Sequence, residues 1–166
     1  MNQHIYAEWL VKRKTPGYVY IAVPAVVLAC LIGLFLAFFT QWGGIATVLI
    51  FVGCYFLVRT FKVEYEYVFV TNELDIDRIL NQSRRKRAYR LQMENVELVA
   101  PWESHELDNF RNNPGFKLVD VSSGYAKHKR YGIVYSESGN NTLFLFEPND
   151  RILDVMHRCS PRKVVQ

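Results

Sequence analysis

A run of basic residues is the part of this sequence best suited to bind a charged partner. The run holds five basic residues within seven positions: Arg84, Arg85, Lys86, Arg87 and Arg90. A Lys or Arg near an anionic membrane surface contributes about 1 kcal/mol of binding free energy, so the run could bind acidic lipid head groups. A second basic group before a predicted strand could join the same surface and comprises Lys127, Lys129 and Arg130. A solvated turn or a contact with a protein partner would explain the same residues.

The remaining reactive side chains show no arrangement typical of catalysis or metal binding. Four polar residues could hold a cation in principle, but no pair has ligand spacing on a defined element: Glu103, His105, Glu106 and Asp108. The cysteines fit neither a disulfide framework nor a zinc site and read as small packing residues: Cys30, Cys54 and Cys159. No nucleophile elbow, phosphate loop or dinucleotide fingerprint is present. We therefore expect no metal, no cofactor and no enzymatic activity.

The overall charge limits the possible partners. The chain carries 20 Lys and Arg against 16 Asp and Glu, a formal net charge of +4. Residues 59–166 hold 17 of the basic and 15 of the acidic residues, so their positive charge is local. A nucleic-acid-binding domain would present a basic field over a whole face. We therefore expect no nucleic-acid partner.

A long uncharged stretch predicts a membrane anchor. Residues 15–58 contain no Asp, Glu, Lys or Arg. About 20 apolar residues cross a bilayer core, so this stretch can hold two spans, near 17–39 and 44–58, joined by a turn at 40–44. Two helices buried in a soluble bundle would each carry a polar face, and these carry none. The sequence thus predicts an N-terminal segment 1–14, a two-helix transmembrane hairpin 15–60 and a cytoplasmic domain 61–166.

Basic residues beside the spans predict the orientation. Residues 12–14 are all basic and precede the first span, Arg59 and Lys62 follow the second, and the connecting turn has no charge. Cytoplasmic flanks of membrane spans are enriched in Lys and Arg. We therefore expect a multi-pass protein of the cell membrane with both termini in the cytoplasm.

Small residues recur every four positions in the first span: Ala25, Ala29, Gly33 and Ala37. Small side chains along one helix face allow another helix to approach closely. The face could pack against the second span of the same hairpin, or it could form the seam of a homodimer.

The hydrophobic period outside the spans indicates a β-rich domain. Residues 2–14 could form an amphipathic helix at the membrane interface, or they could be a frayed end. Apolar residues then alternate with period two, which predicts strands near 63–69, 74–80, 89–93, 116–121, 131–136 and 142–147. A helix should begin after Pro148. Together with the spans, these elements predict an α+β membrane protein whose antiparallel strands form a small barrel or split barrel closed by a C-terminal helix.

One stretch of this pattern resembles a known family. After two spans, the strand and turn Tyr67-Val-Phe-Val-Thr-Asn-Glu-Leu74 precede a basic turn and a strand with Tyr89 and Leu91. This order resembles bacterial pleckstrin-homology-like (PH-like) membrane proteins and a small family of two-span proteins from Firmicutes. Relatives often have Thr-x-x-Arg at the first turn, where this chain has Asn72-Glu73-Leu74. The resemblance implies a binding or scaffold module that presents a cytoplasmic PH-like domain to lipid head groups or protein partners. A membrane-bound hydrolase or transferase with an unrecognised site is the alternative.

Overall fold

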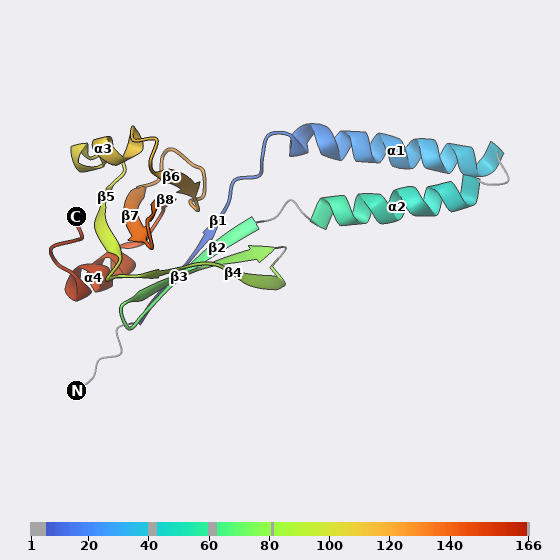
Figure 1. The fold of residues 1–166 in the computed structure, drawn as a ribbon. Coiled ribbons are helices and arrows are strands. Elements are labelled where there is room, and N and C mark those ends of the chain that lie inside the picture. The colour runs from blue at the N-terminus through green and yellow to red at the C-terminus, as the bar shows by residue number, and fades with distance from the viewer. Residues whose placement is uncertain (1–5, 40–42, 60–62, 81, 166) are drawn as a thin grey trace. The chain divides into compact units, whose positions relative to one another are not determined.

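A computed structural model gives the structure of all residues except 1–5, 40–42, 60–62, 81 and 166. The chain divides into two compact units (Figure 1). The helical unit contains residues 15–63 and 80–83, and the β-rich unit contains residues 1–14, 64–79 and 84–166. The N-terminal residues therefore group with the C-terminal two thirds of the chain, although an apolar hairpin separates them in sequence.

Two antiparallel helices form most of the helical unit. Helix α1 spans Val19–Phe39 and helix α2 spans Gly43–Arg59. Among the described residues, α1 is the helix that is long and apolar enough to cross a membrane, and α2 holds a shorter apolar stretch, Thr47–Phe56. Most of α1 is exposed, as expected for a helix whose side chains face lipid. The predicted turn at 40–44 falls largely on residues 40–42, outside the described residues.

The two helices meet closely at Gly33. Gly33 is buried, and its carbonyl oxygen accepts a hydrogen bond of 2.6 Å from Thr47 Oγ1 on α2. A Cβ atom placed on Gly33 would lie 3.2 Å from Ile50 Cδ1. One helical turn away, the sulfur atoms of Cys30 and Cys54 lie 3.7 Å apart. Small side chains therefore permit the contact between the helices.

The predicted seam of small residues follows the observed contact only in part. Ala29 is half-buried beside Gly33, whereas Ala25 and Ala37 are exposed. Four residues overshoot a helical turn by about 40°, so a repeat of four drifts around the helix by about 120° between Ala25 and Ala37. The buried face of α1 instead follows the helical period.

The first sheet of the β-rich unit contains strands β1 to β4 in sequence order. They span Tyr6–Lys12, Val63–Val70, Glu73–Leu80 and Arg84–Gln92. Strand β1 runs antiparallel to β2, with Tyr6 opposite Val70 and Lys12 opposite Glu64. Tyr67, Phe69 and Ile76 point into the core and are fully buried. The predicted strands near 63–69 and 74–80 are confirmed, while the third begins five residues earlier than predicted.

Both alternatives for residues 2–14, an amphipathic helix and a frayed end, are wrong for the described part of this segment, because Tyr6–Lys12 form a strand. Ala7 and Val11 are the buried residues of this segment. A spacing of four places two residues on one face of a helix, and also on one face of a strand, so the sequence pattern fitted both. Pairing with β2 satisfies the backbone of the segment and decides in favour of the strand.

The second sheet has the strand order β5-β7-β8-β6. Its strands span Val96–Pro101 (β5), Lys117–Asp120 (β6), Tyr131–Glu137 (β7) and Asn140–Phe146 (β8). The β6 strand pairs with β8 in parallel, which is an exception to the antiparallel pairing predicted for all strands. A short 3₁₀ turn (His105–Leu107) and helix α3 (Asp108–Arg111) lie between β5 and β6.

The predicted C-terminal helix is confirmed as α4, which spans Asp150–Cys159. The Asn149 side chain caps its first turn by accepting a hydrogen bond of 2.9 Å from Ile152 N–H. Ile152 and Met156 are fully buried, and α4 contacts β1. The N-terminal strand is therefore an integral part of the domain core.

We expect β1 to be required for the domain to fold. Replacing residues 15–62 by a short Gly-Ser linker should give a soluble, folded domain, because Lys12 and Glu64 lie opposite each other. A fragment of residues 63–166 lacks β1 and the burial of Ala7 and Val11, so it should lose about 3 kcal/mol of stability or more. Urea unfolding, monitored by circular dichroism, would compare the unfolding midpoint of the linker variant with that of the 63–166 fragment. Equal unfolding midpoints would contradict the assigned role of β1.

Gly33→Ile should weaken the helical hairpin. Its branched side chain would enter the space held by Ile50 and Thr47, and overpacking of this kind typically costs about 1–3 kcal/mol. Thermal unfolding in detergent would measure the loss, with Leu34→Ile at an exposed position as the matched control. Equal stability of the two variants would reject this seam. Chemical cross-linking of the same variants would test the homodimer alternative. If Gly33→Ile removed a cross-linked dimer without lowering the thermal stability, Gly33 would lie between two copies of the chain.

Candidate functional site

The first basic group lies on strand β4, so its predicted placement in a turn is wrong. Arg85 forms ion pairs with Glu66 on β2 and with Asp77 on β3, the latter with Nε 2.6 Å from Oδ2. Arg90 Nε lies 2.8 Å from Asp75 Oδ1, and Arg87 Nη2 lies 3.5 Å from Asp75 Oδ2. Three of the five basic residues therefore face carboxylates of the same sheet. This arrangement reduces the positive charge available to an anionic ligand.

The Arg85 pair compensates a buried charge. Glu66 is 7% exposed. Burial raises the pKa of the Glu66 carboxyl, and the neighbouring Glu8 raises it further, whereas Arg85 lowers it. On the same sheet, Arg84 and Lys86 are exposed and make no ion pair with any described residue. These two side chains are the part of the run that is available to a partner.

The second basic group lies in the loop before β7. Arg130 Nη2 is 3.6 Å from Glu103 Oε1. Lys129 and Arg130 line a hollow of about 320 Å³ together with Trp102 and Tyr131. None of these residues lines the hollow that Arg90 borders, and no ion pair described here joins the two basic groups. The structure therefore does not bring them together as one site.

A Ser-His-Glu cluster between the same loop and the residue after β8 is visible only in the structure. His128 Nδ1 lies 2.5 Å from Glu147 Oε1 and 3.4 Å from Ser123 Oγ. Both contacts use one ring nitrogen, whereas a catalytic relay needs the acid and the nucleophile on opposite nitrogens. Ser123 also accepts a hydrogen bond of 2.7 Å at its carbonyl from Lys14 N–H. These contacts fasten the loop to Glu147, the residue that follows β8, and to the chain just before α1.

The residues proposed from sequence as possible cation ligands do not converge. His105 Nδ1 lies 3.1 Å from Asp108 Oδ2, and Arg111 pairs with the other oxygen of Asp108. Hydrogen bonds from Arg111 and His105 lower the pKa of the Asp108 carboxyl. Among the described residues, no group of three or more His, Cys, Asp or Glu side chains is arranged to hold a metal ion.

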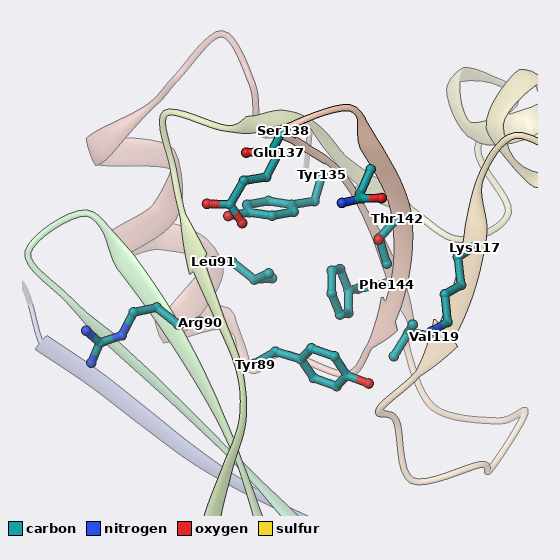
Figure 2. A pocket seen from close by; sticks show the side chains of 11 residues that line it. Tyr89, Arg90, Leu91, Lys117, Val119, Tyr135, Glu137, Ser138, Thr142 and Phe144 are labelled. Atoms are coloured by element: carbon teal, nitrogen blue, oxygen red, sulfur yellow. The ribbon is translucent and has the colours of Figure 1, made fainter.

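A groove of about 390 Å³ opens between β4 and the inner face of the second sheet (Figure 2). Its floor is largely aromatic. The ring centroid of Phe144 lies 5.0 Å from that of Tyr89 and 6.2 Å from that of Tyr135, both in edge-to-face contact. Leu91 adds an aliphatic side chain to this floor. A concave surface that combines apolar and polar side chains can serve as a binding site.

Polar groups surround the aromatic floor. Lys117 borders the groove on β6, and Glu137 borders it at the β7–β8 hairpin. Figure 2 shows these two side chains on opposite sides of the groove, with the guanidinium of Arg90 turned away from it. The Arg90 guanidinium is held by Asp75. No ion pair with a described residue engages Lys117 or Glu137.

One buried group in the groove lacks a hydrogen bond. Tyr135 is 6% exposed, and its hydroxyl has no hydrogen-bond partner among the described residues. Figure 2 shows its ring beside Leu91, with the hydroxyl toward the β4 side of the groove. Buried hydroxyls are normally hydrogen-bonded. Sequence reasoning missed this site. It placed Tyr89 and Tyr135 on predicted strands, but it could not show which residues lie beside them in the fold.

Comparison with known proteins assigns this chain to a family. No curated protein and no solved structure gives a significant match to this chain. The sequence matches the family described as Bacterial PH-like domain (DUF6106) over residues 3–166. The match begins before β1 and continues through α4, so it includes the hairpin and both sheets. The chain therefore belongs to this family of bacterial PH-like domains, in agreement with the resemblance read from the strand at Tyr67.

Proposed function

We propose that this protein is a membrane-anchored binding module, with a two-span hairpin that holds the PH-like domain at the cytoplasmic face of the membrane. The observation that carries the proposal is the pairing of β1 with β2 on either side of an apolar hairpin. A PH-like fold is consistent with a binding or scaffold role. The domain would engage a partner while the hairpin keeps it in the membrane.

The strand pairing argues for two spans over one. Strand β1 ends at Lys12, just before α1, and β2 begins at Val63, just after α2. Because the two strands are hydrogen-bonded neighbours, both ends of the hairpin must emerge on the same side of a membrane. A single crossing by α1 would place β1 and β2 on opposite sides. If α1 crosses the bilayer, the chain must therefore return.

Helix α2 is short for a span but within the tolerated range. Its 17 residues correspond to about 26 Å of helix, against a hydrocarbon core of about 30 Å. Local thinning of the bilayer and extension of flanking Lys and Arg side chains to the interface accommodate such a mismatch. The basic residues at 12–14, 59 and 62 favour a cytoplasmic position for both flanks by the positive-inside rule.

The charge pattern favours a protein partner over a lipid surface. Arg85, Arg87 and Arg90 are engaged by carboxylates of their own sheet, so head-group binding by this run would depend mainly on Arg84 and Lys86. That contact stays a prediction, and unchanged binding to phosphatidylglycerol vesicles by an Arg84→Ala, Lys86→Ala variant would discard it. The Ser-His-Glu cluster gives no support to an enzymatic role, because Ser123 and Glu147 both contact the same ring nitrogen of His128.

Reporter fusions test the proposed topology. Alkaline phosphatase, which is active only outside the cytoplasm, would be joined at the N-terminus, within residues 41–44 and at the C-terminus. We expect activity only from the fusion at 41–44, because the hairpin turn should be the only one of the three fusion points that lies outside the cytoplasm. A fluorescent protein that folds only in the cytoplasm should give the complementary result. Phosphatase activity at either terminus would reject the proposed anchoring.

A further inference from the structure

We propose that the free edge of strand β4 binds an extended acidic segment of a partner protein, which adds to the first sheet as a further strand. The inference rests on the proposed binding role of the domain and adds the binding surface and the class of partner. Its physical basis is an edge strand with free backbone groups, the exposure of that edge, and two unpaired basic side chains on one face of it.

Strand β4 is the longest edge strand of the two sheets in the described part of the chain. It stands last in the strand order β1-β2-β3-β4 and has nine residues. The backbone of residues 84–91 forms no hydrogen bond with the backbone of a described residue outside the sheet. An edge of this kind presents a row of N–H and C=O groups with which an extended chain can pair.

The chain itself covers another edge strand, β5 of the second sheet. Val99 N–H donates a hydrogen bond of 2.7 Å to the Lys163 carbonyl, and the Val99 carbonyl accepts one of 2.8 Å from Val165 N–H. In the first sheet, helix α4 contacts the edge strand β1. Residues 84–87 of β4 are instead all exposed. The β4 edge is therefore accessible to a chain from outside the domain.

The free charges of β4 match an acidic partner. Arg85 and Arg87 reach carboxylates of β3 on one face of the sheet. Because neighbouring residues of a strand point to opposite faces, Arg84 and Lys86 project from the other face. No ion pair with a described residue engages these two side chains. Acidic residues at alternate positions of an added strand would lie opposite them and form cross-strand pairs.

The same charges disfavour other occupants of the edge. Pairing of β4 with a second copy of itself would bring together two strands with five basic residues each, and like charges on opposite strands are destabilising. An anionic membrane surface would attract Arg84 and Lys86 but would offer no strand to the backbone groups. An extended acidic chain satisfies the charges and the backbone together.

Two peptides of the same composition test the expected pattern. A rhodamine-labelled peptide with four Glu-Val repeats would be titrated into the full-length protein in phosphatidylcholine nanodiscs and followed by fluorescence anisotropy, with empty nanodiscs as the blank. We expect saturable binding. Two repeats of Glu-Glu-Val-Val hold no pair of Glu residues two positions apart, so this peptide can place only one Glu opposite Arg84 and Lys86. It should bind about threefold more weakly, the equivalent of one exposed ion pair. Equal affinities would overturn the proposed recognition.

Backbone methylation separates strand pairing from charge attraction. In an added strand, the N–H groups of alternate residues pair with the neighbouring strand. One isomer of the alternating peptide would carry N-methyl groups on all Glu residues, and the other on all Val residues, with no change in charge. We expect one isomer to bind at least about tenfold more weakly than the other, because only one set of N–H groups faces β4. Equal affinities of the two isomers would overturn the edge pairing.

Substitutions then place the peptide on β4. Arg84→Gln with Lys86→Gln should weaken binding of the alternating peptide about tenfold, the equivalent of two exposed ion pairs, and should remove its advantage over the Glu-Glu-Val-Val peptide. Lys127→Gln with Arg162→Gln removes two exposed charges elsewhere on the domain and should leave the affinity unchanged. Equal losses in the two double variants would assign the attraction to the overall charge and overturn the site.

A purely protective role of Arg84 and Lys86 predicts a different result. Charged side chains on an edge strand also keep sheets from pairing with one another. In that case Arg84→Gln with Lys86→Gln would raise the yield of a cross-linked dimer and leave the peptide affinity unchanged, which would overturn the proposal.

The outcomes distinguish this inference from the proposed function. No saturable binding of the alternating peptide at millimolar concentration would overturn the partner class and leave the proposed anchoring intact. Phosphatase activity at a terminus in the reporter fusions would reject the anchoring without affecting the peptide titrations.

Discussion

The antiparallel pairing of β1 with β2 is the constraint on which the rest of this structure depends. Seven residues before the helical hairpin pair with the strand that follows it, from Tyr6 opposite Val70 to Lys12 opposite Glu64. The hairpin is thus an insertion between neighbouring strands of one sheet. Helix α4 packs on the same N-terminal strand, so the domain core closes only when both sides of the hairpin are together.

The charges of the β-rich domain are organised by the same sheet. Glu66 on β2 and Asp75 and Asp77 on β3 lie where the arginines of β4 can reach them. Buried carboxylates need such partners because removal from water favours their neutral form. The basic run therefore pairs first with carboxylates of its own sheet, whereas Lys117 and Glu137, which border the groove beside β4, form no ion pair with a described residue.

Much of the architecture could be predicted from local patterns, but contacts between distant segments could not. The absence of charge over 15–58 indicated the hairpin, and period-two alternation indicated β2 and β3. The helix expected over 2–14 rested on Ile5, Trp9 and Leu10 sharing one face, and the spacing of four between Ile5 and Trp9 fits one face of a strand as well, so only pairing with β2 revealed β1. The ion pairs of Arg85 depend on strand register, and the groove joins Tyr89 to Tyr135 from different sheets, which no local pattern encodes.

Disulfide trapping of β1 against β2 in native membranes tests the central claim most directly. In a chain with its own cysteines replaced by Ala, Glu8→Cys with Val68→Cys would place two thiols at directly paired positions. Copper phenanthroline should then form an intramolecular disulfide at high yield, detected as a mobility shift that a reductant reverses. Glu8→Cys with Glu137→Cys, at positions on different sheets, is the control. Equal yields in the two pairs, or no disulfide in the first, would contradict the pairing.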